Sequence, residues 1–240
     1  MLKSSISLFV VTILLGVSGA AQKVLNDPDA EVRTATGYHS VSVSSGIDLY
    51  LTQGDEETVV ISAEDKIKER IKTEVTNGVL KIYIEWKSNI KISWNNKKPS
   101  KAYVSYKSLK SISGSGGSDI RLVDGIIKTD ELHIFLSGGS DFNGSVDVSK
   151  LNINQSGGSD SDIRGSAGRM EADISGGCDI DAYGLAVENC VINASGGSDA
   201  RINVSAKLVA NASGGSDIDV KGKCEITKNT SGASEIRRRD

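Results

Sequence analysis

Apolar and polar residues alternate along most of the C-terminal half of the chain. Leu151 and Ile153 flank Asn152, and Ile180 and Ala182 continue the same spacing further on. Successive side chains of a β-strand point to opposite faces, so a period of two indicates a strand with one buried face. The pattern therefore predicts a succession of short, half-buried strands in this part of the chain.

The alternation is organised around a Ser-Gly-Gly-Ser-Asp turn that recurs seven times. The intervals between its first serines are 22, 19, 19, 20, 18 and 18 residues. One such unit cannot bury its own apolar face, so successive units must stack on one another. The copies occupy residues 115–119, 137–141, 156–160, 175–179, 195–199, 213–217 and 231–235, the last reading Ser-Gly-Ala-Ser-Glu.

This repeat predicts an all-β fold, a right-handed parallel β-helix or solenoid with coils of about 19 residues over residues 109–240. Coils rise by ~4.8 Å, the spacing of strands within a sheet, so seven of them span roughly 30 Å. The Gly-Gly pair permits the positive φ angles that a tight corner needs. Small apolar residues such as Ala172 and Ala210 fit a thin interior.

Charged residues end the repeat. Lys228 takes a position that is apolar or small in earlier copies, and Arg237, Arg238 and Arg239 follow the last turn. The end of a solenoid exposes unpaired backbone and invites end-to-end growth, which charge opposes. We interpret this tail as a cap; a basic patch for an anionic surface is the alternative.

Residues 22–108 lack the repeat but remain rich in strand patterns. Asn77-Gly78 lies between two apolar runs and is a hairpin signal. Residues 64–71 predict a short helix. Residues 44–48, Ser-Ser-Gly-Ile-Asp, resemble a degenerate copy of the turn, so this part is interpreted as an irregular start of the same solenoid. A separate small β-domain is the alternative.

The N-terminus has the pattern of a signal peptide over residues 1–21. Lys3 precedes an apolar run over residues 6–17, and small residues follow at Ser18 to Ala21. The run is too short to span a bilayer, and no second apolar stretch follows. We expect an exported chain, in the periplasm or at the cell surface, that does not span the membrane after cleavage. A retained membrane anchor is the alternative.

Composition argues against several functions. The net charge of -3 provides no field that would collect nucleic acid. Cys178, Cys190 and Cys224 occupy repeat positions or apolar slots, no CxxC pair is present, and His39 and His133 are far apart in sequence. No cofactor, zinc site or catalytic residue is predicted.

The fifth residue of each turn is acidic, Asp in six copies and Glu235 in the last, and this acidic column is the best candidate for chemistry. If the turns stack, neighbouring carboxylates repel by roughly 0.9 kcal/mol in water at ~4.8 Å, and by more near a protein surface. Three arrangements would relieve this repulsion. Each carboxylate could accept hydrogen bonds from backbone N–H groups of its own turn, the side chains could point outward into solvent, or the carboxylates could bind a hard cation such as Ca²⁺. The calcium candidates are Asp119, Asp141, Asp160, Asp179, Asp199 and Asp217. One carboxylate per coil, with Ser beside it, is a small ligand set for such an ion.

Two further groups of residues are candidates for binding. A polar outer column contains Asn154, Asp173, Asn193 and Asn211, whose stacked side chains can hydrogen-bond to one another or present a flat surface to a sugar polymer. Trp86 and Trp94 lie among lysines that include Lys87, Lys91, Lys97 and Lys98. These aromatic residues suit either carbohydrate stacking or strand packing.

Several segments resemble one bacterial family. Residues 43–54, Val-Ser-Ser-Gly-Ile-Asp-Leu-Tyr-Leu-Thr-Gln-Gly, are similar to the opening of the head GIN domain of auto-transporter adhesins. Residues 71–75 with Asn77-Gly78, and residues 109–112 leading into the first repeat, match as well. The resemblance covers the chain from about residue 38 onward. It implies an exported β-helical protein and carries over no catalytic residues.

Export, repeat and the lack of a catalytic constellation together predict a non-catalytic cell-envelope solenoid. We expect an adhesin or binding module whose partner is an envelope or extracellular polysaccharide or protein. A structural or assembly element of the envelope is the first alternative. A polysaccharide-active β-helix enzyme, which would need a carboxylate cluster in a groove, is the second.

Overall fold

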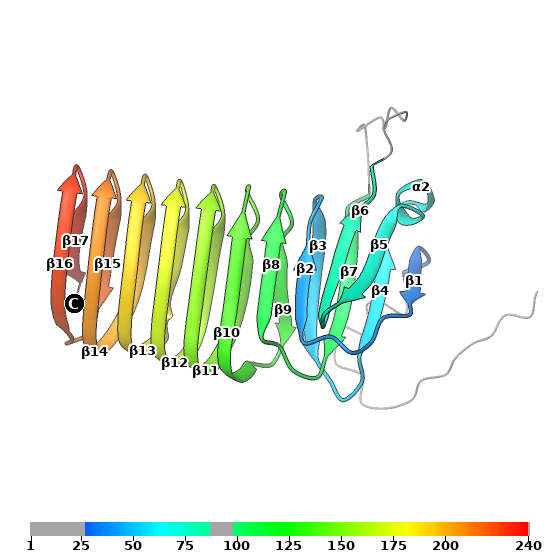
Figure 1. Cartoon of the computed structure of the whole chain (residues 1–240), viewed down its shortest axis with the longest axis horizontal. Coiled ribbons are helices and arrows are strands. Elements are labelled where there is room, and N and C mark those ends of the chain that lie inside the picture. The colour runs from blue at the N-terminus through cyan, green and yellow to red at the C-terminus, as the bar shows by residue number, and fades with distance from the viewer. Residues whose placement is uncertain (1–26, 87–97, 240) are drawn as a thin grey trace, which may run out of the picture.

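A computed structural model describes residues 27–86 and 98–239. The molecule is an elongated row of stacked coils, with an irregular group of strands at the N-terminal end (Figure 1). The predicted signal peptide lies outside the described residues. The all-β solenoid with coils of about 19 residues is confirmed.

Seventeen strands and one short helix make up the described chain. The N-terminal elements are β1 (Ala30–Arg33), β2 (Ser40–Val43), β3 (Ile47–Gln53), β4 (Thr58–Ser62), α2 (Asp65–Lys68), β5 (Ile71–Thr76), β6 (Val79–Ile84) and β7 (Ser100–Tyr106). The remaining strands are β8 (Ser111–Ser115), β9 (Ile120–Asp124), β10 (Ile127–Ser137), β11 (Phe142–Gly157), β12 (Asp160–Gly176), β13 (Asp179–Gly196), β14 (Asp199–Gly214), β15 (Asp217–Lys221), β16 (Glu225–Gly232) and β17 (Glu235–Arg239).

Equivalent residues of successive coils lie beside one another in parallel register. Ser156 pairs with Ser175, which pairs with Ser195, which pairs with Ser213. Each of β11 to β14 runs through nearly a whole coil and is interrupted only at the glycine corner. The repeat interval thus sets the register, because a constant interval places the same residue type at the same position of every coil.

A narrow apolar interior runs the length of the stack. One column of it consists of Leu151, Met170, Cys190 and Leu208, all at most 3% exposed. Parallel columns of other apolar residues complete the core, and the intervening polar residues face outward. The hydrophobic effect therefore stabilises contacts between coils rather than contacts within one coil.

The N-terminal part is an irregular start of the solenoid, as predicted. β2 and β3 form a coil that pairs on one side with β8 and β9 and on the other with β6 and β7. Its corner carries Ser45 and Gly46, both at positive φ, so residues 44–48 are a degenerate copy of the turn. The spatial order of the coils here differs from the order along the chain.

Antiparallel strands close the N-terminal end. β5 and β6 form the predicted hairpin around Asn77-Gly78, which have φ angles of 51° and 74°. β4 pairs antiparallel with β7, and β1 pairs antiparallel with β4. The short helix α2 lies within the range that the sequence predicts. These strands interrupt the parallel stack and cover its edge.

Charged side chains close the C-terminal end, as the sequence predicts. Lys228 occupies the interior column below Ala210, and its Nζ donates to the carbonyl of Ile236 at 3.3 Å. Arg238 follows Val220 in another interior column and donates through Nη2 to the carbonyl of Cys224 at 2.6 Å. The charged side chains of Lys228 and Arg238 bind carbonyl groups of the last coil and so cover the end of the apolar core with hydrophilic groups.

The glycine corner differs in one respect from the sequence prediction. Both glycines have positive φ in the first two repeats, but from the third repeat onward only the first one does. Gly176 has a φ of +97°, whereas its neighbour Gly177 does not lie in that region. The second position therefore accepts a side chain, which agrees with Ala233 in the last copy.

In six of the seven turns the fourth residue contacts the carbonyl of the turn's first residue and so closes the turn. Ser198 is fully buried and donates through Oγ to the carbonyl of Ser195 at 2.9 Å. Cys178 stands at the same position and its Sγ contacts the carbonyl of Ser175 at 3.1 Å. The same contact is made by Ser140, Ser159, Ser216 and Ser234.

Replacing Ser198 by alanine is expected to lower the free energy of unfolding by about 1–2 kcal/mol, because a buried hydrogen bond is lost. Urea denaturation measures the change. Ser195→Ala, on the outer surface of the same turn, is the matched control and should change stability by less than about 0.5 kcal/mol. Equal effects of the two changes would show that the buried hydroxyl does not close the turn.

Candidate functional site

Two outer columns form a continuous surface along the seven coils. We call this surface the hydroxyl–amide face. Asp173 is its one charged residue, and Phe135 its one aromatic residue. The first column contains Ser115, Ser137, Ser156, Ser175, Ser195, Ser213 and Ser231; the second contains Ser113, Phe135, Asn154, Asp173, Asn193, Asn211 and Asn229.

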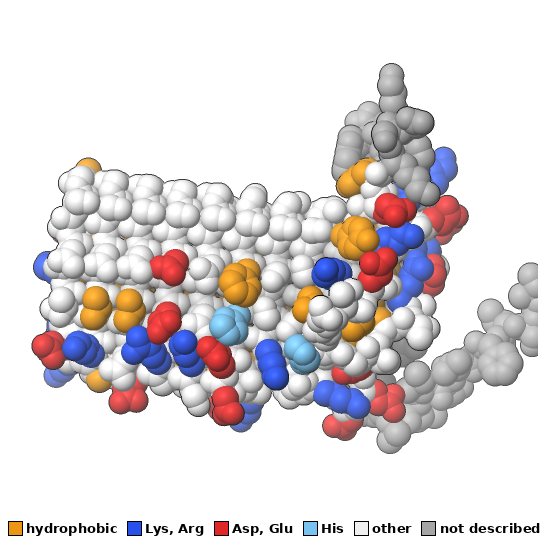
Figure 2. Space-filling model, viewed as in Figure 1, with side chains coloured by type: hydrophobic (Ala, Val, Ile, Leu, Met, Phe, Trp, Pro, Cys, Tyr) orange, Lys and Arg blue, Asp and Glu red, His pale blue; other side chains and the backbone are white. Residues whose placement is uncertain are grey.

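The space-filling view separates this face from the charged part of the surface. In Figure 2 the upper band of the solenoid is white along its length, which marks side chains that are neither charged nor apolar, together with backbone. Charged side chains gather along the lower edge. Several of these pair with one another, as Lys150 does with Glu131 at 3.4 Å and Glu171 at 3.6 Å. The face thus offers hydrogen-bonding groups with little charge.

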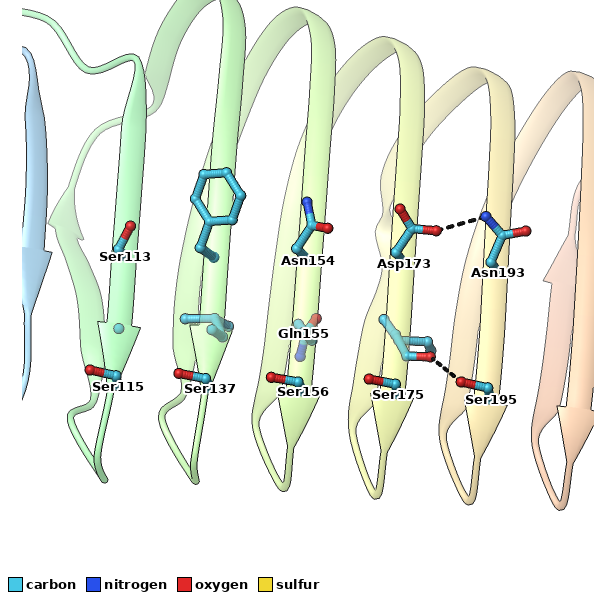
Figure 3. A pocket seen from close by; sticks show the side chains of 14 residues that line it. Ser113, Ser115, Ser137, Asn154, Gln155, Ser156, Asp173, Ser175, Asn193 and Ser195 are labelled. Carbon is cyan, nitrogen blue, oxygen red and sulfur yellow. Dashed lines mark hydrogen bonds between the residues drawn. The ribbon is translucent and has the colours of Figure 1, made fainter.

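The amide column forms a hydrogen-bonded ladder. Asn193 donates through Nδ2 to Asp173 at 2.7 Å, Asn211 donates to Asn193 at 2.7 Å, and Asn229 donates to Asn211 at 2.9 Å. Figure 3 shows the first of these bonds running from one coil to the next. The predicted hydrogen bonding between stacked Asn side chains is therefore confirmed. Because an amide has two N–H groups, each ladder residue keeps one for another partner.

A shallow trough lies between the two columns. It has a volume of about 530 Å³ and is lined over five coils from Ser115 to Ser195. A second depression of about 240 Å³ continues it to Ser231. Figure 3 shows the serine side chains side by side along the coils. The trough therefore runs parallel to the solenoid axis.

Phe135 interrupts the amide column with an aromatic ring. Its side chain is 43% exposed, and the ring stacks on His133 with centroids 6.0 Å apart and planes 4° apart. Sequence reasoning missed this residue. The signal that could have found it is its repeat position, two residues before Ser137, where four other copies have Asn and one has Asp.

The predicted acidic column exists on another outer surface. The repulsion between its carboxylates is relieved by hydrogen bonds that differ from the expected ones. The Oδ1 atom of Asp160 accepts the N–H of Asp179 at 3.0 Å, and Asp199 accepts that of Asp217 at 3.1 Å. The donor thus belongs to the next coil, not to the residue's own turn. Burial, followed by repulsion from neighbouring carboxylates, raises the pKa of Asp179. The remaining contacts of this kind join Asp141 to Asp160 and Asp217 to Glu235.

The calcium candidates lie in this column, and four of them, Asp119, Asp141, Asp160 and Asp179, line a groove of about 320 Å³. Within residues 27–86 and 98–239, no group of three or more His, Cys, Asp or Glu side chains is placed to hold a metal ion. Asp119 also pairs with Arg121 at 2.9 Å. Calcium binding by Asp119, Asp141, Asp160, Asp179, Asp199 and Asp217 stays a prediction.

The three cysteines are free and buried. Cys190 packs in an interior column, and burial raises the pKa of its thiol to about 12. Such a thiol is protonated at neutral pH and is a poor nucleophile and metal ligand. The positions of Cys178 and Cys190 agree with the interpretation that they fill repeat positions.

The aromatic–basic cluster is only partly described. Trp86 is 49% exposed, whereas Trp94, Lys87, Lys91 and Lys97 lie outside the described residues. Lys98 binds Asp27 at 2.9 Å and Asp29 at 2.7 Å, and these bonds raise the pKa of its ammonium group to about 12. Lys98 is therefore engaged within the protein.

A buried polar group within the core escaped the sequence analysis. Gln155 is 3% exposed and stands where other coils have apolar residues. Its Nε2 donates to the carbonyl of Ser159 at 2.8 Å, and its Oε1 accepts from Ser161 at 2.8 Å. Because both ends of the amide are satisfied within the core, we assign this group to structure rather than to binding.

Several solved structures share the architecture. A protein from Bacteroides fragilis NCTC 9343, described as a "putative adhesin", is similar over 88% of this chain and 96% of its own, with a TM-score of 0.80 and 22% identity. Two proteins from Parabacteroides distasonis ATCC 8503 also match. One, described as a "putative lipid binding protein", covers 89% and 98% of the two chains with a TM-score of 0.67 and 20% identity. The other, a "putative adhesin", covers 88% and 96% with a TM-score of 0.69 and 19% identity.

Sequence comparison identifies the family. No functionally curated protein matches the chain. Among the described residues, no helix has the length and apolar character required to cross a membrane. The family model described as "Putative auto-transporter adhesin, head GIN domain" matches residues 37–224. The solenoid with its glycine corners and stacked polar columns thus belongs to the head GIN domain family.

Proposed function

We propose that this protein is an exported, non-catalytic binding module of the cell envelope, with the hydroxyl–amide face as its binding surface. The observation that carries the proposal is the continuity of that face. Its serine and amide columns follow one another over seven coils, and a trough lies between them. A rigid row of outward hydrogen-bonding groups suits recognition of an extended polymer or surface.

Four observations support the parts of this proposal. The matching family model is described as "Putative auto-transporter adhesin, head GIN domain", and the N-terminal pattern is that of a signal peptide. The carboxylates of the acidic column are spread along the solenoid and accept backbone N–H groups, an arrangement that suits structure better than acid–base catalysis. Charged groups at the C-terminal coil oppose end-to-end growth, which favours a binding module over an assembly element.

Adding charge to the face tests the proposal. The double substitution Ser175→Lys with Asn193→Lys places two cations in adjacent coils of the trough. We expect binding of the exported chain to envelope preparations of its source cells to fall roughly tenfold or more, because a bound ligand would have to bury and desolvate an ammonium group. Co-sedimentation at several protein concentrations measures the change.

The matched control places the same charges on another outer surface. Asn143→Lys with Asn203→Lys changes two outward residues of the strands that follow the turns. This variant should bind as the native chain does. Equal loss in both double variants, or binding by neither the native chain nor the variants, would contradict the assignment of the face.

A further inference from the structure

The geometry of the face points to a specific class of ligand, and this inference rests on the proposed function. We infer that the hydroxyl–amide face binds an uncharged polysaccharide strand that lies parallel to the solenoid axis, with one sugar ring stacked on Phe135. Three features of the described residues carry the inference: the lack of charge, the axial trough and the exposed aromatic ring.

The low charge of the face selects a neutral ligand. Asp173 is the one acidic or basic residue of the two columns, and its carboxyl group already accepts a hydrogen bond from Nδ2 of Asn193 at 2.7 Å. No Lys or Arg stands in either column to pair with a phosphate, sulfate or carboxylate. Anionic ligands bind best to Arg and Lys, whereas hydroxyl and amide groups hydrogen-bond to sugar hydroxyls.

The trough fixes the direction of the ligand. Its lining takes two outward side chains from each of five successive coils. Coils repeat every ~4.8 Å, which is close to the length of one ring in an extended polysaccharide. Within the described chain, the hydroxyls of Ser137, Ser156 and Ser175 make no hydrogen bond to the protein, and each amide of the ladder retains an N–H. Successive rings can therefore meet equivalent partners.

Phe135 provides the apolar contact that a sugar strand needs. The side chain of Phe135 is 43% exposed, so one face of its ring is open to a ligand. Stacking on His133 holds the ring in one orientation beside the trough, with centroids 6.0 Å apart. The C–H groups on one side of a pyranose pack against such a ring, while its hydroxyls reach the flanking serine and amide side chains.

Calorimetry with oligosaccharides of increasing length tests the inference. The probes are neutral gluco-, manno- and galacto-oligosaccharides of about two to eight rings, with oligogalacturonides of equal length as charged probes. For the preferred neutral series we expect affinity to rise with each ring up to about seven, because each added ring meets a further coil. The charged series should bind at least roughly tenfold more weakly.

Two substitutions locate the strand on the face. Phe135→Ala should weaken the binding of every length by roughly tenfold, whereas Phe135→Trp should preserve it. Asn211→Lys lies four coils from Phe135 and should weaken only the oligosaccharides long enough to reach it. Ile126→Ala, which removes an exposed apolar side chain outside the two columns, is the matched control and should change nothing.

The outcomes separate this inference from the proposed function. Absence of binding by all neutral probes, no increase in affinity beyond two or three rings, or an unchanged affinity in Phe135→Ala would each overturn the inference. If the Ser175→Lys and Asn193→Lys variant still loses envelope binding in those cases, the proposed function survives and only the ligand class is wrong. If envelope binding is also unaffected, both are wrong.

Discussion

Replacing Gly176 by alanine is expected to lower the free energy of unfolding by about 2–4 kcal/mol. The residue has a φ of +97°, where an L side chain is strained. A Cβ atom there would also lie 2.5 Å from the carbonyl oxygen of Gly157 in the preceding coil. That oxygen accepts the N–H of Gly177 at 2.8 Å, so it cannot move without breaking a contact between coils.

The neighbouring glycine provides the control within the same corner. A Cβ atom on Gly177 would have its nearest neighbour, the same carbonyl oxygen, at 3.9 Å, and its φ is not in the positive region. Gly177→Ala should therefore change stability by less than about 0.5 kcal/mol. Urea denaturation of both variants measures the difference. Similar destabilisation by the two changes would mean that the corner does not tolerate any side chain, contrary to the geometry.

Removing the charged groups from the C-terminal interior columns is expected to make the protein self-associate. Lys228→Ile with Arg238→Val would continue the apolar columns that reach Ala210 and Val220. The last coil would then present an apolar end beside unpaired strand backbone, which is the template for edge-to-edge pairing. Light scattering should show a monomer for the native chain and a growing mass with concentration for the variant.

A second substitution at the same end tests whether the loss of any charge, or only the loss of an inward-facing charge, causes self-association. Arg239 pairs with Asp219 at 3.1 Å on the outer surface, so Arg239→Gln removes a charge without exposing an apolar column. This variant should remain monomeric. Association of Arg239→Gln, or a double variant that stays monomeric at high concentration, would show that the inward-facing cations are not what prevents growth.

The sequence alone determined the repeating architecture. A constant interval between turns and a period of two within strands leave one way to bury the apolar residues, which is to stack equivalent positions of successive coils. The columns of Ser156 and Ser175, Asn193 and Asn211, and Asp160 and Asp179 follow from that stacking. The charged cap was also predictable, because Lys228 and Arg238 break an otherwise regular pattern.

The tertiary structure decided what depends on contacts between residues far apart in the chain. The coil of β2 and β3 lies between β6–β7 and β8–β9, an order that no local pattern specifies. Four aspartates of the acidic column accept a hydrogen bond from the following coil, because the stacked backbone brings that N–H closest. The position of the exposed Phe135 beside an axial trough could be recognised only in the structure. The trough is formed by five stacked coils and is not a property of any single repeat.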